Sequence, residues 1–148
     1  METLRLDSSG PDVKRVQERL AELGFNPGKV DGEFGAGTEA AVLDLTDGMR
    51  GSVAICYEST YPTLARDFVT AGAQFLMVIT NDAWFGDTVA PHQHLAMARL
   101  RCVEFRRPMV RAANSGISAV IDSRGEVAAS LGLFRRGTVT AEVRPGSG

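Results

Sequence analysis

Lysine is almost absent from this chain of 148 residues, which contains only Lys14 and Lys29 beside fourteen arginines. Cysteine is equally scarce: Cys56 and Cys102 permit one disulfide but lack the dense spacing of a disulfide scaffold. No apolar run approaches the ~20 residues that span a bilayer, and the N-terminal sequence METLR lacks the apolar core of a signal peptide. We therefore expect no segment in this sequence that exports or anchors the chain.

The charge balance is nearly even, with 16 basic and 18 acidic residues and a net charge of −2. This balance gives no reason to expect binding to nucleic acid. A hydrophobic content of 44% and a charged content of 23% are typical of a globular protein. Several arginines cluster late in the chain, at Arg99, Arg101, Arg106, Arg107 and Arg111. A solvated helix face is the commoner explanation for such a cluster, and contact with anionic lipid or a partner is the alternative.

Residues 4–43 predict a compact helical unit. A proline at position 11, followed by Asp12, favours the first turn of a helix. Apolar residues then recur at spacings of three and four, at Val13, Val16, Leu20 and Leu23. Thr38 is suited to cap a last helix that contains Val42 and Leu43.

The same segment carries a family pattern. The run VDGEFGAGTEAAV at residues 30–42, with GPDV at 10–13 and LAELGF at 20–25, resembles a peptidoglycan-binding domain of the three-helix type. The resemblance covers about 40 residues and implies that residues 1–45 bind cell-wall glycan or peptide in a groove around Phe34. The last helix of this module looks short, because the chain turns polar at Asp47-Gly48.

The rest of the chain changes to an alternation of strands and helices. Apolar runs predict strands at residues 52–57, 75–80, 109–113, 117–122, 127–131 and 138–143. Helical patterns occupy residues 62–70 and 91–107, and residues 145–148 form a flexible tail. This order predicts a layered α/β sheet whose strands are apolar throughout.

Polar residues follow two of these predicted strands. Cys56 and Glu58 close the first, and Asn81 and Asp82 close the second. A cysteine after an apolar run is more often a core residue than a catalyst. However, the carboxyl ends of adjacent parallel strands form a ligand crevice, and a thiol is a good nucleophile near neutral pH when a neighbour activates it. The two strand ends together therefore predict a site.

The second half also resembles a known family. The sequences ICYES at residues 55–59, ITNDAWFG at 79–86, PHQH at 91–94 and RAANSGIS at 111–118 are similar to the carbon–nitrogen hydrolase (nitrilase) superfamily. More narrowly, residues 49–144 resemble the C-terminal part of the bacterial apolipoprotein N-acyltransferases. The fold implied is a partial αββα nitrilase-like sandwich after the small three-helix module.

The resemblance also implies a site and a reaction. Cys56 would be the nucleophile that carries an acyl thioester, with Tyr57 and Glu58 beside it. Residues that would contact substrate are Asn81, Trp84 and Phe85. The donor would be a phospholipid and the acceptor the amino terminus of an apolipoprotein, at the periplasmic side of the bacterial inner membrane. Neither a cofactor nor a metal is implied.

Two helpers of the family's cysteine are expected to be missing. The family uses a glutamate as general base and a lysine that stabilises the oxyanion, both from earlier parts of its domain. Lys14 and Lys29 align with the peptidoglycan-binding pattern and inherit neither role. A general base contributes ~10²–10⁴-fold and an oxyanion donor ~10²–10³-fold, so we expect half an active site with negligible turnover. The alternative function is a peptidoglycan-binding cell-wall module with a non-catalytic remnant domain.

The remaining candidates have simpler explanations. His92 and His94 stand two apart near a helix start, which points them away from a common metal and favours a capping or surface role. Cys102 shares a helical stripe with apolar residues and is expected to pack. Trp84 and Phe85 either line an acyl pocket near the site or close the core. Half a sandwich would leave an apolar sheet or helix face uncovered, which predicts a homo-oligomer.

Overall fold

The computed structural model describes residues 9–22, 25–26, 29–33, 42–44, 48–142 and 144. Within these residues the strands are β1 (Phe25–Asn26), β2 (Val42–Asp44), β3 (Arg50–Ile55), β4 (Phe75–Thr80), β5 (Met109–Ala113), β6 (Ser118–Ile121) and β7 (Val127–Leu131). The helices are α1 (Pro11–Glu22), α3 (Pro62–Thr70) and α4 (Ala90–Phe105), with short 3₁₀ turns η2 (Cys56–Thr60) and η3 (Ala83–Phe85).

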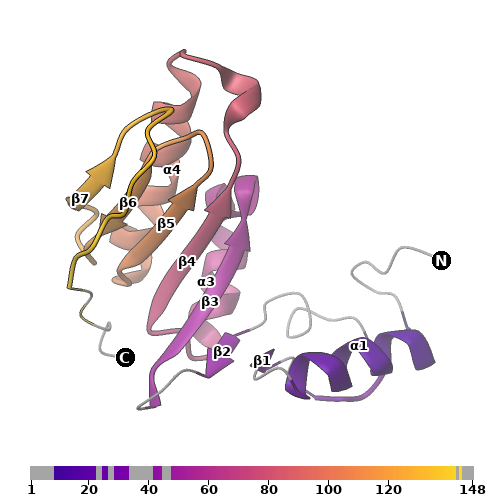
Figure 1. Cartoon of the computed structure of the whole chain (residues 1–148). Helices are drawn as coiled ribbons and strands as arrows, with labels where there is room; N and C mark the ends of the chain where they lie inside the picture. Colours follow the sequence, from indigo (N-terminus) through magenta and orange to yellow (C-terminus); the bar gives the residue numbers. More distant parts are fainter. Residues whose placement is uncertain are drawn as a thin grey trace.

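The seven described strands form one mixed sheet whose spatial order follows the chain (Figure 1). Strands β3, β4 and β5 are parallel, with α3 and α4 in the crossovers between them, and the other pairings are antiparallel. In this register Ile55 at the end of β3 is paired with Ile79 near the end of β4. The polar residues that follow the two strands are therefore neighbours at one edge of the sheet.

Helices α3 and α4 cover the rear face of the sheet as it is drawn in Figure 1. Alternate residues of β3 and β4, including Ala54 and Val78, are buried there together with Phe68 of α3 and Cys102 of α4. This apolar cluster is the main core of the described residues, and burial of about 25 cal/mol per Å² of apolar surface stabilises it.

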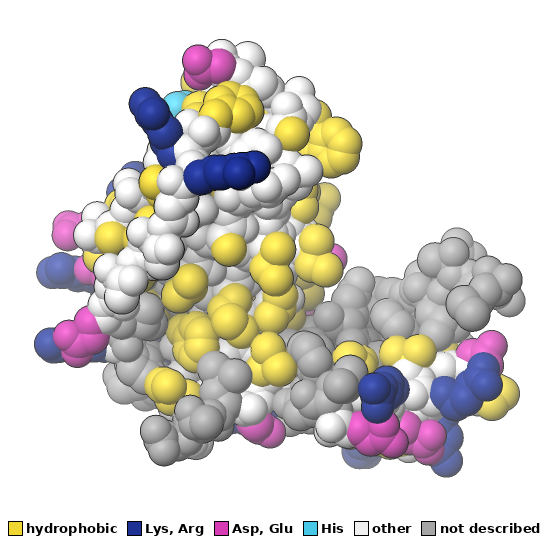
Figure 2. Space-filling model, in the orientation of Figure 1, with side chains coloured by type: hydrophobic (Ala, Val, Ile, Leu, Met, Phe, Trp, Pro, Cys, Tyr) yellow, Lys and Arg dark blue, Asp and Glu magenta, His cyan; other side chains and the backbone are white. Residues whose placement is uncertain are grey.

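The front face of the same sheet has no helical layer over it in the described structure. Figure 2 shows hydrophobic side chains across this face. They alternate in sequence with the buried set, as the period of two in a strand requires. Ile55 is 63% exposed and Ile79 is 58% exposed, although both belong to strands whose other side chains are mostly buried. The sheet therefore has one covered face and one open apolar face.

Most of the predicted elements are confirmed. Helix 62–70 and strands 75–80, 109–113 and 127–131 have the expected bounds. The strand predicted over residues 52–57 instead ends at Ile55, because Cys56 begins the turn η2.

The strand predicted at residues 138–143 was wrong, since residues 138–142 belong to no strand. Alternation makes a strand only where an edge is available for pairing. After β7 the backbone N–H of Phe134 donates to the carbonyl oxygen of Ser115 (3.1 Å), which bonds this part of the chain to the loop after β5.

The helical unit at the start of the chain is organised by one buried amide. The side chain of Gln17, on α1, is 1% exposed. Its Nε2 donates to the carbonyl oxygens of Lys29 and Glu33 and to Asp31 Oδ1, at 3.0 to 3.1 Å. Its Oε1 accepts the backbone N–H of Gly32 at 2.8 Å. One side chain therefore joins α1 to the turn at residues 31–33.

The prediction of a last helix through Val42 and Leu43 was wrong. These two residues lie in β2, which pairs antiparallel with β3, and Val42 is fully buried. Their apolar character suits either element, and the neighbouring edge of β3 decides between them. The expected cap at Thr38 and the groove at Phe34 lie outside the described residues, as does the tail at 145–148.

Candidate active site

Cys56 is the first residue after β3, and its backbone is strained. Its φ angle is 54°, in the left-handed region that residues with a side chain rarely adopt. Such a conformation costs about 1–2 kcal/mol and persists only where surrounding contacts hold it. The cysteine is a free thiol that is partly exposed. Backbone strain at a partly exposed thiol, at the carboxyl end of a parallel strand, is typical of a functional site.

The turn that contains Cys56 is held by bonds to its carbonyl groups. Ser59 Oγ donates to the Cys56 carbonyl oxygen (2.8 Å), and Thr60 Oγ1 donates to that of Tyr57 (2.7 Å). From helix α4, Arg101 Nη1 donates to the Thr60 carbonyl oxygen (2.8 Å). The turn is thus fixed both internally and by the helix behind it.

Glu58 and Tyr57 lie beside the thiol in this turn. The carboxylate of Glu58 accepts the backbone N–H of Ile55 at 2.6 Å. Glu58 therefore stabilises the junction between the end of β3 and the turn η2, which begins at Cys56. The ring of Tyr57 lies against the imidazole of His94, with centroids 5.4 Å apart.

The residues after β4 form the other side of this edge. Asn81 Oδ1 accepts the backbone N–H of Ala83 (3.1 Å) and the hydroxyl of Ser115 (3.3 Å), which ties the loop after β4 to the loop after β5. Trp84 is 80% exposed, so it does not close the core. Phe85 is half-buried, and its ring meets His94 edge-on at 6.3 Å.

Behind the two strand ends lies a buried polar cluster of Asp82, His94 and Arg111. Asp82 Oδ2 accepts Nη2 of Arg111 at 2.8 Å, and both side chains have no exposed surface. The other oxygen, Oδ1, lies 3.0 Å from His94 Nδ1 and accepts the Thr80 hydroxyl at 2.9 Å. Nε2 of His94 lies 3.2 Å from the carbonyl oxygen of Cys56. The cluster therefore connects strands β4 and β5 and helix α4 to the strained residue.

Burial dominates the electrostatics of this region. Desolvation lowers the pKa of the Arg111 guanidinium from its ordinary value, while the charge of Asp82, and to a smaller degree Cys56, acts in the opposite direction. Burial raises the pKa of the Cys102 thiol to about 12. Cys102 is fully buried in the helix-covered core, so its expected packing role is confirmed.

Two sequence interpretations were wrong here. A capping or surface role fits His92, which is exposed, but His94 is 1% exposed and lies at the centre of the cluster. The late arginines are not one solvated face either, because Arg101, Arg107 and Arg111 are buried. Only Arg111 carried a usable signal. It stands inside an apolar strand, where a charged side chain requires a buried partner.

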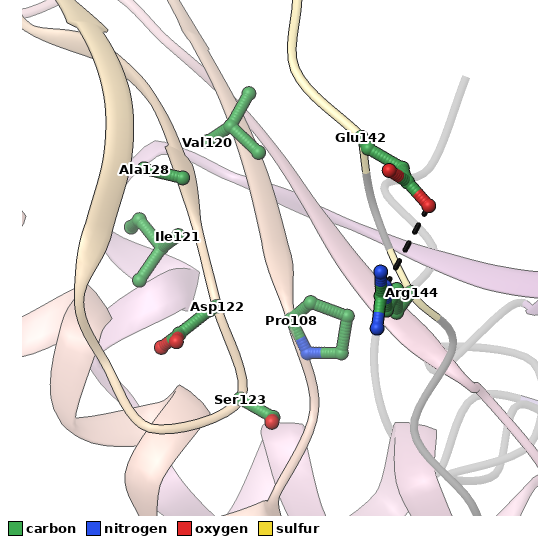
Figure 3. A pocket seen from close by; sticks show the side chains of 8 residues that line it. All are labelled: Pro108, Val120, Ile121, Asp122, Ser123, Ala128, Glu142 and Arg144. Carbon is green, nitrogen blue, oxygen red and sulfur yellow. Dashed lines mark ion pairs between the residues drawn. The ribbon is translucent and has the colours of Figure 1, made fainter.

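The described residues offer little else that could hold a ligand. No group of three or more His, Cys, Asp or Glu side chains among them could bind a metal ion. None of their helices is long and apolar enough to cross a membrane. A pocket of about 250 Å³ lies between the start of β5, the β6–β7 hairpin and the C-terminal segment, where Glu142 pairs with Arg144 (Figure 3). This pocket is at the amino end of β5, opposite the edge that bears Cys56.

This chain is similar in sequence and in structure to proteins whose family is known. The sequence profile described as carbon–nitrogen hydrolase matches residues 12–147. The chain belongs to the carbon–nitrogen hydrolase family. Among solved structures, nitrilase-superfamily member Nit3 of Saccharomyces cerevisiae has a TM-score of 0.57 at 23% identity, over 66% of this chain and 38% of that protein. This likeness establishes the fold, a partial αββα sandwich.

A second structural relative of this chain has a modified cysteine. A mutant of an amidase from Nesterenkonia sp. AN1 shows covalent addition of the acetamide moiety of fluoroacetamide at its active-site cysteine. That structure has a TM-score of 0.53 and 26% identity over 62% of this chain and 36% of the amidase.

Several curated relatives are apolipoprotein N-acyltransferases. That of Geobacter metallireducens is 46% identical over 117 residues, and that of Rhizobium etli is 42% identical over 130 residues. These matches cover 79% and 86% of this chain. The chain spans only 22% and 24% of the length of the two relatives.

Proposed function

We propose that Cys56 is the nucleophile of an acyl transfer from a phospholipid to the amino terminus of a lipoprotein. The observation that supports this most is the position of the thiol. It is partly exposed in a left-handed turn at the carboxyl end of β3, beside the end of β4. The identity of 46% with an apolipoprotein N-acyltransferase favours this reaction over other carbon–nitrogen hydrolase chemistry. By the same resemblance, the site of action is the periplasmic side of the inner membrane.

The reaction has two balanced steps. In the first, the Cys56 thiol loses its proton and the sulfur attacks the ester carbonyl of the phospholipid, a C–S bond forms, and the C–O bond to the lysophospholipid breaks as that proton passes to the departing oxygen. In the second, the free amine of the lipoprotein attacks the thioester, a C–N bond forms and the C–S bond breaks. The proton that the amine loses returns to the sulfur.

The other predicted site residues have roles that follow from their positions. Tyr57 and Glu58 shape the turn of the nucleophile, through the ring contact with His94 and the bond to the Ile55 backbone. Asn81 joins the two loops that border the site. Trp84 and Phe85 follow directly, and the exposed indole offers an apolar surface for an acyl chain.

We propose that these residues alone acylate but do not turn over. In the family a glutamate base and a lysine from earlier parts of the domain assist the cysteine, and together they supply several orders of magnitude in rate. Lys14 and Lys29 both precede β2, and because they stand in the peptidoglycan-binding pattern we assign neither of them the role of the family's lysine. Reaction with an activated ester should therefore stop after one equivalent.

Mass spectrometry of the intact protein and its peptides tests the proposal. The chain is incubated with p-nitrophenyl butyrate or with phosphatidylethanolamine vesicles, and release of p-nitrophenolate is followed in parallel. We expect one acyl adduct on the peptide containing Cys56 and none on Cys102, whose pKa of about 12 and burial make it an internal control. Cys56→Ser should abolish the adduct. An unmodified Cys56 with both donors would refute the proposal and favour a non-catalytic remnant.

We also propose that residues 1–45 bind peptidoglycan. The supporting observation is the bonding of Gln17 to residues 29–33, which orders the Asp31-Gly32 turn on which the resemblance rests. The boundary with residues 49–144 then falls between β2 and β3, with β2 paired to the sheet. Sedimentation with purified peptidoglycan should retain Cys56→Ser and lose Gln17→Ala. Equal retention of Gln17→Ala would contradict the assignment.

Finally, we propose that the chain self-associates through the open face of the sheet. Ile55 and Ile79 are both more than half exposed on this face, and apolar sheet surface of this kind favours a partner. Light scattering should show a dimer or larger species that Ile79→Glu dissociates. A monodisperse wild-type monomer would contradict this proposal.

A further inference from the structure

The strained backbone of Cys56 needs a holding contact, and the buried imidazole of His94 supplies one. Its Nε2 lies 3.2 Å from the Cys56 carbonyl oxygen and 3.3 Å from Ser59 Oγ. The Ser59 hydroxyl hydrogen is already used, because Ser59 donates to the same carbonyl at 2.8 Å. Both neighbours of Nε2 among the described residues therefore present lone pairs. An unprotonated Nε2 would face two oxygen lone pairs there, so we assign a hydrogen to this nitrogen.

The opposite side of the ring is fixed by a pair of charges. Asp82 Oδ1 lies 3.0 Å and Arg111 Nη2 lies 3.2 Å from His94 Nδ1. Nδ1 lies within reach of both an acceptor, the carboxylate, and a donor, the guanidinium, so the contacts on this side orient the ring and the contacts of Nε2 assign its hydrogen. Arg111 also donates its Nε–H to the Ile117 carbonyl oxygen at 3.2 Å, which anchors it to the start of β6.

The carboxylate itself has no room to move away. A Cβ added at Gly116 would lie 2.2 Å from Asp82 Oδ2, so the backbone of Gly116 lies directly against this oxygen. Thr80 and Arg111 occupy the other positions around the carboxyl group. The geometry of the imidazole is thus determined by groups from β4, β5 and the loop before β6.

We propose that His94 is a positioning residue whose Nε2–H, aimed by Asp82 and Arg111, holds Cys56 in the left-handed conformation that presents its thiol. The proposal depends on the proposed function only in naming Cys56 the nucleophile. His94 acts through the backbone of Cys56 and does not touch the reacting atoms. The chain as it stands can test it, because no step of the test requires turnover.

Two substitutions separate the two halves of the ring. Glutamine at position 94 places its amide nitrogen near the position of Nε2 and keeps the donor to Cys56. Asparagine places its nitrogen near Nδ1 and keeps the contact to Asp82. A residue that only fills the core or pairs with Asp82 would be replaced at least as well by asparagine. A residue that holds Cys56 is replaced better by glutamine.

Hydrogen exchange and NMR of Cys56 measure the outcome. In His94→Asn, amides in residues 55–61 should exchange about tenfold faster than in His94→Gln, while peptides from β4 and β5 change equally in the two variants. The ¹³Cα and carbonyl ¹³C shifts of Cys56 should stay near their wild-type values in His94→Gln and move in His94→Asn. His92→Ala, on the exposed neighbour, is the matched control and should change neither readout.

The imidazole signal provides an independent check. The sequence contains two histidines, so His92→Ala leaves one ring to assign in a long-range ¹H–¹⁵N spectrum. A protonated Nε2 at His94 is expected in the wild type. An unprotonated Nε2, or equal exchange of residues 55–61 in His94→Gln and His94→Asn, would overturn the proposal. Failure of Cys56 to acylate would refute the proposed function while leaving these measurements unaffected.

Discussion

The two faces of the central sheet are formed by the same strands, but one face is covered by helices and the other is exposed. Behind the sheet, α3 and α4 seal a core in which Ala98, Cys102 and Ile121 have no exposed surface. In front, Ile55 and Ile79 are more than half exposed, although neighbours in the same strands are buried. The site lies where the faces meet, with a buried charged cluster on the helix side and the partly exposed thiol at the strand ends. Stability in this molecule is therefore concentrated on one face.

Removing the charge behind the site should have the largest effect. Arg111→Met leaves the Asp82 carboxylate buried without its guanidinium, and breaking such a pair costs about 3–5 kcal/mol in the free energy of unfolding. Urea denaturation measures the loss. Arg66→Met is the control, because that arginine is exposed on α3 and should lose less than about 1 kcal/mol. Equal losses in the two variants would show that the buried pair contributes no more to the free energy of unfolding than an exposed arginine does.

A matched pair of isoleucines compares the faces directly. Ile121→Ala removes a fully buried side chain and should cost about 2–5 kcal/mol, whereas Ile79→Ala removes one that is 58% exposed and should cost less than about 1 kcal/mol. Thermal unfolding at low protein concentration measures both. A cost for Ile79→Ala that grows with protein concentration would mean that a second copy covers the open face.

Gly116→Ala should produce an intermediate effect on the covered side. Its new methyl group would lie 2.2 Å from Asp82 Oδ2, and the carboxyl group is held by Arg111 and His94. Overpacking of this kind costs about 1–3 kcal/mol. Gly132→Ala is a suitable control, since the added Cβ meets no atom within 4 Å. Chemical denaturation of both variants compares the costs, and a Gly116→Ala variant as stable as Gly132→Ala would show that the cluster relaxes easily.

The smallest expected effect concerns neither face but the β6–β7 hairpin. Asp122 accepts the backbone N–H groups of Glu126 and Arg124, and these bonds lower its pKa below the ordinary value of 3.8. Because the folded-state pKa is depressed, the stabilisation is complete above pH ~3.8 and disappears as the pH falls through the folded-state pKa. Asp122→Asn should therefore lower Tm more at pH 6 than at pH 2. A difference that is the same at both pH values would contradict this linkage.

The sequence predicted the layered sheet well because its signals are local. Apolar runs such as residues 75–80 and 109–113 have the length of a buried strand and are too short for a typical helix. Local signals failed where the secondary structure depends on a neighbouring strand. Val42 suits a helix or a strand, and it lies in a strand because β2 pairs with β3. At residues 138–142 the alternation was present but no strand formed.

The site was predicted in part for the same reason. Cys56 and Asn81 were predicted as site residues because each follows an apolar run, and the structure places both at the carboxyl ends of neighbouring parallel strands. The left-handed backbone of Cys56 has no signature in the residue type, which is neither glycine nor asparagine. His94 was missed because its environment is non-local. Its partners, Asp82 and Arg111, are 12 and 17 residues away along the chain. Arg111 indicates that a buried partner exists, but the sequence does not identify that partner.

The amide of Gln17 has a consequence for how the first unit tolerates change. Its two N–H hydrogens are shared among three oxygens and its Oε1 accepts the N–H of Gly32, so both ends of the amide are bonded and its orientation is determined. Glutamate, its nearest isostere, would set a carboxylate against those three oxygens, one of them the anionic Asp31. Deamidation of this one side chain would therefore replace the hydrogen bonds that join α1 to residues 29–33 with repulsion between oxygens.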